Sequence, residues 1–209
     1  MGLWLGCCGA PALWAGRMGA FDQKRRAMEE RWREAGEPEL VLACSACLQT
    51  FRRHAPGMRV VSVWEVLEEL RAKGVALPQA AGADRSLVLY LPCTLRDEPQ
   101  IRELLRRAAE ATGAGVRPYP EEEECCGYGG LQACANQDLA DETAARIVER
   151  VGEETLLVGC AMCRDRFASV GARVVHVLDL IFPEGRGADS LPPRLSERRE
   201  NREIGRAHV

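Results

Sequence analysis

The sequence has very little lysine and no excess of positive charge. Of its 28 lysine and arginine residues only Lys24 and Lys73 are lysines, and 31 acidic residues leave a formal net charge of -3. A protein that binds nucleic acid through its phosphates carries a strongly basic surface. The composition therefore argues against a nucleic-acid partner.

Long apolar segments are also missing. No apolar run approaches the roughly 20 residues that a membrane-spanning helix needs. The apolar start, MGLWLGCCGAPALWAG, lacks the basic first region of a signal peptide, and only six residues precede Cys7. We therefore expect a soluble, cytoplasmic protein without a transmembrane segment, for which peripheral docking on a membrane partner stays open.

Two cofactor motifs do not occur. The chain has no GxGxxG fingerprint, so any flavin or nicotinamide site, FAD included, must lie on a partner or on another domain. It also lacks the closely spaced CxxCxxC pattern by which ordinary cubane iron–sulfur clusters are held. We therefore do not expect the chain itself to bind a dinucleotide through that fingerprint, or an ordinary cubane cluster through that cysteine pattern.

What the chain does have is ten cysteines in an unusual arrangement. Most stand in CC or CxxC pairs, a pattern typical of metal or redox sites in a reducing cytosol. Cys125 and Cys126 are neighbours, and adjacent Cα atoms lie about 3.8 Å apart, whereas ordinary disulfides need roughly 4.4 to 6.8 Å. A disulfide within this pair is therefore a poor explanation for it.

An internal repeat organises the chain. Three blocks match three later blocks in the same order: GCCGAPALWAG (6–16) with ECCGYGGLQAC (124–134), LVLACSACLQTF (40–51) with LLVGCAMCRDRF (156–167), and RVVSVWEVL (59–67) with RVVHVLDLI (173–181). Chance does not keep three blocks in register, so we expect two copies of one structural unit.

In the second copy, short apolar runs alternate with amphipathic segments. Strands are predicted at SLVLYL, GVRPYP, TLLVG and RVVHV, and helices at DEPQIRELLRRAAEATG, LADETAARIVERVG and CRDRFAS. Strands that alternate with helices form mainly parallel sheets. The predicted fold class is therefore α/β, with two repeated Rossmann-like cysteine-rich units built on mainly parallel sheets.

The repeat also sets the predicted boundaries. Residues 1–72 form a first unit truncated at its N-terminus, because nothing in it corresponds to residues 86–124, and residues 86–183 form a complete second unit. The Ala-, Gly- and Pro-rich segment 73–85 is the linker between them. We expect the polar tail 184–209 to be disordered, and its last seven residues, EIGRAHV, resemble a translated sequencing adapter and hence an artefact.

Five cysteines of the second unit follow strands or begin helices: Cys93, Cys125, Cys126, Cys160 and Cys163. The carboxyl ends of parallel strands converge on one crevice, so these thiols should meet in one pocket. Crowded thiolates repel one another, which favours protonated, oxidised or metal-bound forms. A closed zinc site takes only four ligands, whereas a cluster with several irons can use a fifth.

Three glycines follow the CC pair: Gly127, Gly129 and Gly130. Glycine permits tight turns and the close approach of backbone N–H groups to sulfur. Such hydrogen bonds tune the potential of an iron–sulfur cluster. We therefore expect this loop to lie against a bound cofactor.

The order of these cysteines resembles a known family. A cysteine, a CCG triplet and a CxxC pair follow one another, with 31 residues between Cys93 and Cys125 and 33 between Cys126 and Cys160. This pattern is similar to the CCG or cysteine-rich domain of heterodisulfide reductase. The same domain is found in the iron–sulfur subunits of glycolate oxidase and anaerobic glycerol-3-phosphate dehydrogenase.

The resemblance implies a cofactor and a class of function. In that family the cysteines hold noncubane [4Fe-4S] clusters or act as redox sites beside a flavoprotein. Carried over, the five thiols of the second unit would bind one noncubane cluster. The chain would then be an electron-transfer or disulfide-reducing subunit of an oxidoreductase complex, whose partner is a flavoprotein or another iron–sulfur subunit.

In the first unit the resemblance is incomplete. Cys7, Cys8, Cys44 and Cys47 match the family pattern. The cysteine expected about thirty residues upstream of the CC pair lies outside this chain. Whether this unit binds a cluster, zinc or nothing therefore stays open.

Two other functions stay open for the whole chain. One is a non-enzymatic module in which zinc is structural and the paired units dock on a protein. The other is a metal-free thiol–disulfide redox protein that uses the CSAC and CAMC pairs, since thiols at helix starts have lowered pKa values. The metal content of the protein would distinguish an iron–sulfur subunit from these two functions. Because one of them is not enzymatic, whether the protein is an enzyme stays open.

Other side chains near the motifs have a structural and a functional interpretation. Cys134 has no cysteine counterpart in the first unit and is expected in the core. His176, replaced there by Ser62, is expected to make a local hydrogen bond. Arg164 and Arg166 either offset thiolate charge or form the outer face of a helix. The acidic run before the CC pair is expected to be a solvated loop.

Overall fold

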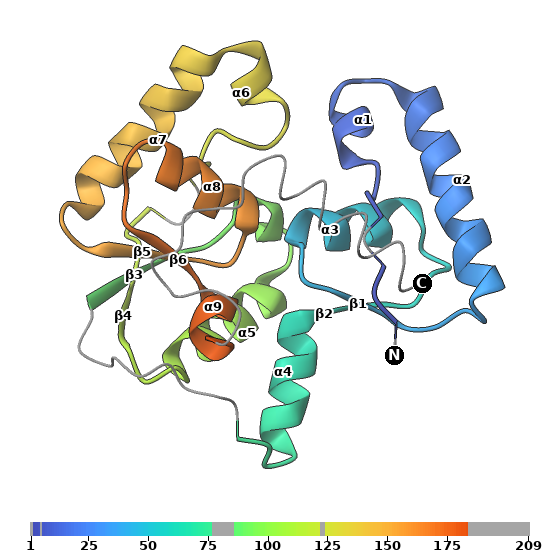
Figure 1. Cartoon of the computed structure of the whole chain (residues 1–209), viewed down its shortest axis with the longest axis horizontal. Helices are drawn as coiled ribbons and strands as arrows, with labels where there is room; N and C mark the ends of the chain where they lie inside the picture. Colours follow the sequence, from blue (N-terminus) through green and yellow to red (C-terminus); the bar gives the residue numbers. More distant parts are fainter. Residues whose placement is uncertain (1, 5, 77–85, 122–123, 184–209) are drawn as a thin grey trace.

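The computed structural model describes residues 2–4, 6–76, 86–121 and 124–183 (Figure 1). The predicted tail and most of the predicted linker lie outside these ranges. Within them, helices and strands follow one another in two groups that match the two units of the repeat.

The first unit contains a small parallel sheet with helices around it. In chain order its elements are α1 (Ala10–Trp14), α2 (Met18–Glu34), β1 (Leu40–Leu42), α3 (Ser45–His54), β2 (Val60–Ser62) and α4 (Val63–Ala72). β1 and β2 pair with Val41 opposite Val61. Within the described residues no strand pairs with the other edge of β1.

The second unit is built on a larger sheet. Its elements are β3 (Ser86–Tyr90), the 3-10 turn η1 (Cys93–Leu95), α5 (Pro99–Glu110), β4 (Gly115–Pro118), α6 (Gln132–Ala135), α7 (Gln137–Val151), β5 (Thr155–Val158), α8 (Ala161–Ser169), β6 (Val174–His176) and α9 (Val177–Ile181). The strands are all parallel, in the order β4-β3-β5-β6. Parallel strands need crossover connections, and the helices of these connections cover both faces of the sheet.

Side chains of β3 alternate between the two faces of this sheet. Leu87 and Leu89 pack in a core with residues of α5 and α9, whereas Val88 and Tyr90 pack in a second core with residues of α7 and α8. Successive residues of a strand point to opposite faces. The unbroken apolar run of β3 is therefore explained by burial on both sides.

The two units follow one plan. The succession α1, α2, β1, α3, β2, α4 of the first unit corresponds to α6, α7, β5, α8, β6, α9 of the second. The α/β fold with two repeated units and parallel sheets is thus confirmed. Among the described residues the first unit has no counterpart of β3, η1, α5 and β4, the part for which the sequence repeat has no match.

The units share a core instead of standing apart. Three residues of the first unit belong to the core on the α5 and α9 face of the larger sheet: Leu48, Trp64 and Leu67. An ion pair between Arg52 and Glu98, at 2.5 Å, crosses the same boundary. Because partly exposed ion pairs contribute little, apolar burial is the main force that holds the units together.

Corresponding helix starts show the repeat in detail. Ser62 caps α4 by accepting a hydrogen bond from the Trp64 N–H at 3.3 Å, and His176 Nδ1 accepts one from the Leu178 N–H of α9 at 3.1 Å. The rings of Trp64 and His176 stack with centroids 6.4 Å apart. The expected local hydrogen bond of His176 is confirmed, and it serves as a helix cap.

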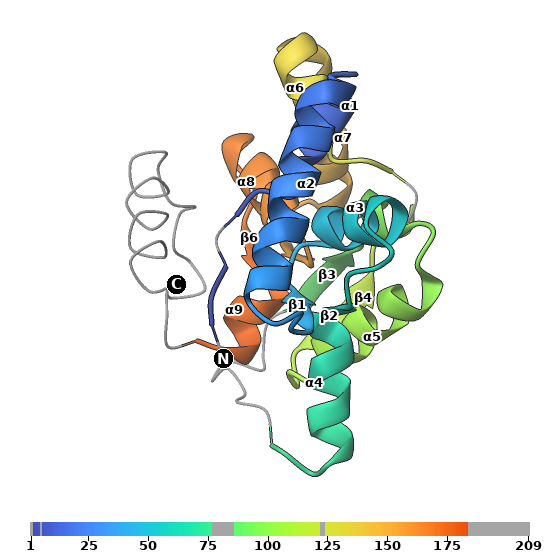
Figure 2. The ribbon, with the colours of Figure 1, turned by 90° about the vertical axis from the view of Figure 1, so that its right-hand side faces the viewer.

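The helices that follow the two CC pairs lie toward one end of the molecule. Seen from two directions, α1 and α6 are close to this end and α4 is at the opposite one (Figure 1, Figure 2). None of the helices in the described ranges is long and apolar enough to cross a bilayer.

We predict that His176 makes stability fall with acid. Burial lowers its pKa from 6.5 to about 4. Of the charged groups that face it, Arg164 lowers this pKa as well, whereas Asp179 and Asp165 raise it. Because the folded pKa is below the unfolded value, the unfolded state takes up the proton first, and stability is lost as pH falls from 6.5 toward 4. The loss between pH 7 and pH 5 should be about 2 kcal/mol.

Urea unfolding at these two pH values measures this loss. In His176→Ser, which copies the Ser62 cap of the first unit, the free energy of unfolding should depend less on pH by that amount. An equal dependence in variant and wild type would contradict the prediction.

Candidate metal centre

Parallel pairing of β3 with β5 brings two cysteine loops together. Tyr90, the last residue of β3, lies opposite Val158, the last residue of β5. Cys93 follows in η1, and Cys160 is the N-cap residue of α8, whose first turn carries Cys163. Both loops therefore leave the sheet at the same edge.

The five thiols of the second unit form a line of sulfur contacts. Cys93 Sγ lies 3.6 Å from Cys125 Sγ, and Cys163 Sγ lies 3.4 Å from Cys126 Sγ. Cys125 and Cys126 are neighbours in the sequence, and Cys160 and Cys163 are close enough to shift each other's pKa, so the five thiols form one group. The predicted ligand residues of this unit thus lie together, although they come from loops far apart in the sequence.

Exposure differs along this line. Cys126, Cys160 and Cys163 are buried, whereas Cys93 and Cys125 are partly exposed. The thiol site is therefore enclosed beside α8 and reachable from solvent at its Cys93 end.

Neighbouring thiols shift one another's pKa values in opposite directions. The thiols of Cys126 and Cys93 lower the pKa of Cys125 to about 2, and the thiol of Cys163 lowers the pKa of Cys160. Donation to Cys126, the nearby Cys160 and burial raise the pKa of Cys163. The two thiols with a lowered pKa, Cys125 and Cys160, are not neighbours in this line, and this separation limits repulsion between thiolates.

Gly127 adds a backbone hydrogen bond to this line. Its N–H donates to Cys125 Sγ at 3.4 Å, its φ is 77°, and a Cβ atom would stand 3.3 Å from the Ala140 carbonyl oxygen. Gly130 also has a positive φ, 67°, but open space around it, and a Cβ at Gly129 would make only an ordinary contact at 3.9 Å. Of the three glycines, Gly127 alone combines left-handed backbone with close approach.

The first unit repeats this geometry with its four thiols. The Gly9 N–H donates to Cys7 Sγ at 3.5 Å. The nearby thiols of Cys47 and Cys7 lower the pKa of Cys8 to about 3, and the thiol of Cys47 lowers the pKa of Cys44 to about 7. Cys8 belongs to the core of this unit and Cys47 packs against that core, so the CC pair and the CxxC pair lie close together here as well.

The two groups of thiols lie next to each other at the boundary between the units. Ser45 and Thr94, which directly follow Cys44 and Cys93, share a hydrogen bond of 2.6 Å between their hydroxyl oxygens. Cys44 also lies within electrostatic range of Cys160. The first unit therefore borders the thiol site of the second.

The grouped cysteines are compatible with the binding of a metal cluster. Throughout the described ranges, no three Cys, His, Asp or Glu side chains converge as ligands of a single metal ion. Thiolates are ligands both of zinc ions and of iron–sulfur clusters.

The acidic run before the CC pair has partners that the sequence did not reveal. Glu124 accepts hydrogen bonds from the Tyr119 hydroxyl at 2.7 Å and from Arg150 at 2.5 Å. Arg150 also pairs with Glu121 at 3.0 Å, while 122–123 lie outside the described ranges. The described part of the run is therefore tied to α7 and is more than a solvated loop.

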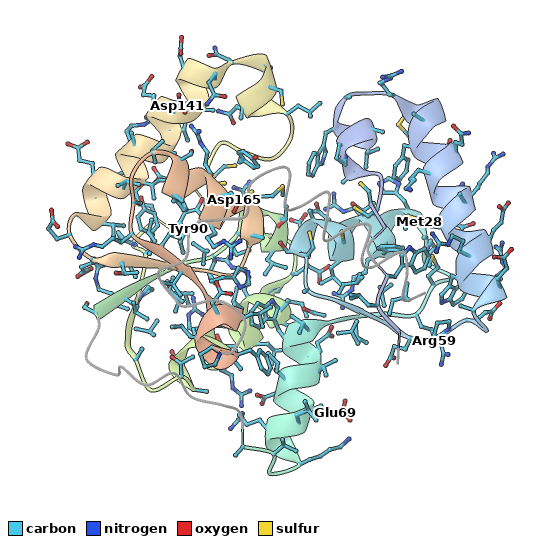
Figure 3. All side chains as sticks on the ribbon, in the orientation of Figure 1. Met28, Arg59, Glu69, Tyr90, Asp141 and Asp165 are labelled. Atoms are coloured by element: carbon cyan, nitrogen blue, oxygen red, sulfur yellow. The ribbon has the colours of Figure 1, made fainter. Side chains whose placement is uncertain are left out.

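One expectation for a neighbouring residue, Cys134, was wrong, and one of the two interpretations of Arg164 and Arg166 is excluded. Cys134 is exposed, because α6 is a single turn at the surface. Arg166 is only 2% exposed and pairs at 2.6 Å with Asp141 of α7, labelled in Figure 3, and Arg164 pairs with Asp179 of α9 at 3.3 Å. The two arginines are thus not the outer face of a helix, since they join α8 to its neighbours.

A comparison with known domains gives the family of the chain. The sequence model of the CCG cysteine-rich domain matches residues 4–52 and 87–168, with one match in each unit. The chain belongs to the CCG cysteine-rich domain family. The matched ranges contain all nine cysteines of the two thiol groups, and the family is associated with iron–sulfur oxidoreductase subunits. A comparison with curated proteins finds no match.

We predict that Gly127→Ala is more harmful than Gly130→Ala. Both changes place a Cβ on a left-handed residue, which costs roughly 1–2 kcal/mol. At Gly127 the new Cβ also crowds the Ala140 carbonyl, and moving this backbone disturbs the hydrogen bond to Cys125. Urea unfolding of both variants gives the two costs, and equal values would show that the close approach does not matter.

Proposed function

We propose that this CCG protein is an iron–sulfur subunit of a heterodisulfide-reductase-like oxidoreductase, which passes electrons to a disulfide or another carrier. The observation that carries the proposal is the line of sulfur contacts within one family-matched unit. One noncubane [4Fe-4S] cluster would be held by the five thiols of that unit: Cys93, Cys125, Cys126, Cys160 and Cys163.

The adjacent cysteines support a cluster with several irons. Cys125 contacts Cys93, whereas Cys126 contacts Cys163, so the two neighbouring side chains diverge toward different parts of the site. Diverging ligands suit two different iron atoms better than two corners of one ion. The five-thiol count points the same way, because a closed zinc site takes four ligands.

The surroundings of the thiols fit electron transfer. When bound, such a cluster supplies reversible electron transfer at a potential that hydrogen bonds to its sulfurs tune. The Gly127 N–H already donates to Cys125 Sγ. Buried thiols keep water from one end of the line, and the partly exposed Cys93 and Cys125 leave the other end open to a disulfide or a carrier.

The electron donor belongs to a partner in this proposal. The chain has no flavin or nicotinamide fingerprint, so we propose that a flavoprotein or a second iron–sulfur subunit delivers the electrons. The four thiols of the first unit could hold zinc or a second cluster, or remain free. A cytoplasmic location and peripheral docking on a membrane partner stay predictions from the sequence.

Metal analysis tests the proposal. The full chain is produced without oxygen, and iron, zinc, acid-labile sulfide and the visible spectrum are measured together. We expect about four irons and four sulfides per chain. Cys126→Ser should remove most of both, since Cys126 is buried in the middle of the line. Cys134→Ser is the matched control and should leave both unchanged, because Cys134 is exposed on α6.

Two results would contradict the cluster. Zinc in a colourless protein would support the structural zinc module instead. A metal-free protein whose CxxC pairs oxidise and reduce reversibly would support the thiol–disulfide redox protein.

A further inference from the structure

We propose that Tyr90 is a positioning residue for the thiol site: its hydroxyl fixes the backbone just before the CC pair and so sets the separation of Cys93 from Cys125. No motif points to Tyr90, because it ends a strand whose apolar pattern already explains it as a core residue. The inference concerns the thiols themselves and holds for any metal that they bind.

One hydrogen bond connects the two parts of the chain. The Tyr90 hydroxyl donates to the carbonyl oxygen of Glu124 at 2.6 Å. Tyr90 stands three residues before Cys93, and Glu124 stands directly before Cys125. This side chain therefore links the strand that leads into one thiol to the loop that carries the other, and these thiols lie 3.6 Å apart.

Core packing fixes the position of the hydroxyl. Tyr90 is 2% exposed and lies between the sheet and helices α7 and α8 (Figure 3). Its ring meets Phe167 edge-on, with centroids 5.0 Å apart, and Tyr119 at 5.6 Å. Phe167 belongs to α8, the helix that carries Cys163, so the ring is held by the same elements that form the site.

The hydroxyl stays protonated and therefore remains a hydrogen-bond donor. Burial raises the pKa of Tyr90 far above its ordinary value, and the neighbouring cysteines, Cys163 first among them, raise it further. Tyr90 also packs in one core with Cys126 and Cys163, so its phenol ring lies beside the line of thiols. A buried hydroxyl without its acceptor would be costly, so the contact with Glu124 is maintained.

The side chain of Glu124 is held separately. Tyr119 and Arg150 bind its carboxylate, whereas Tyr90 binds its backbone carbonyl. Tyr90→Phe and Tyr119→Phe each remove one hydroxyl from neighbouring rings of one core. They therefore form a matched pair that separates the backbone contact from the side-chain contact.

Disulfide formation in the metal-free, reduced protein measures the separation of the thiols. Oxidised glutathione first forms a mixed disulfide with one thiol, and the second thiol then displaces glutathione. The net reaction converts two protein thiols and one oxidised glutathione into one protein disulfide and two reduced glutathiones. The rate of the second step depends on how closely the two sulfurs are held, and mass spectrometry of peptides identifies the pair that forms.

We expect Tyr90→Phe to slow closure of the Cys93–Cys125 disulfide about fivefold, the factor that corresponds to one ordinary hydrogen bond. Closure between Cys8 and Cys47 in the first unit, which Tyr90 does not touch, is the control within the same molecule and should be unchanged. Tyr119→Phe should leave both rates within about twofold of wild type, which in free energy is less than half of the effect of one ordinary hydrogen bond.

Several outcomes would overturn the inference. Closure of Cys93–Cys125 at the wild-type rate in Tyr90→Phe would show that the hydroxyl does not position the loop. Equal slowing in the first unit, or loss of the fold, would make Tyr90 a general core residue. Because no metal is present, these results do not depend on whether the proposed iron–sulfur function is correct.

Discussion

The register of β3 against β5 is the constraint on which the rest of the site depends. With Tyr90 opposite Val158, the loops that carry Cys93 and Cys160 leave the sheet side by side. A shift by one residue would turn every strand side chain to the other face. Tyr90 would then point into the α5 and α9 core, away from Glu124. The sulfur contacts and the contact that holds the CC loop therefore rest on the same backbone hydrogen bonds.

The two units follow one plan, but they do not act as independent modules. Leu48 and Trp64 of the first unit complete the core beneath the larger sheet. Ser45 binds Thr94 beside the Cys93 loop, so the first unit forms one border of the second unit's thiol site. Separation of the units would expose apolar surface on both sides of this boundary. A change in one thiol loop can thus be felt in the other through direct contacts.

Crowding five thiols into a partly buried site has an electrostatic cost that the chain lowers locally. Neighbouring thiols shift one another's pKa values, and the two thiols whose pKa is lowered, Cys125 and Cys160, are not next to each other. Arg96 adds a positive charge near Cys125. A bound metal would remove the same repulsion by displacing the shared protons, so the crowding that is costly in the metal-free protein favours metal binding.

The sequence by itself determined the repeat, the order of strands and helices, and the meeting of five thiols at one edge of a sheet. Each of these follows from local periodicity, spacing and the rule that parallel strands end together. The tertiary structure decided the exposure of Cys134, the burial of Arg166 and the contact of Tyr90 with Glu124. Local composition does not show these features, because they depend on which helix faces meet. Long-range packing decides which faces meet. A buried tyrosine that only fills the core and one that also holds a loop have the same sequence pattern, so the sequence does not distinguish them.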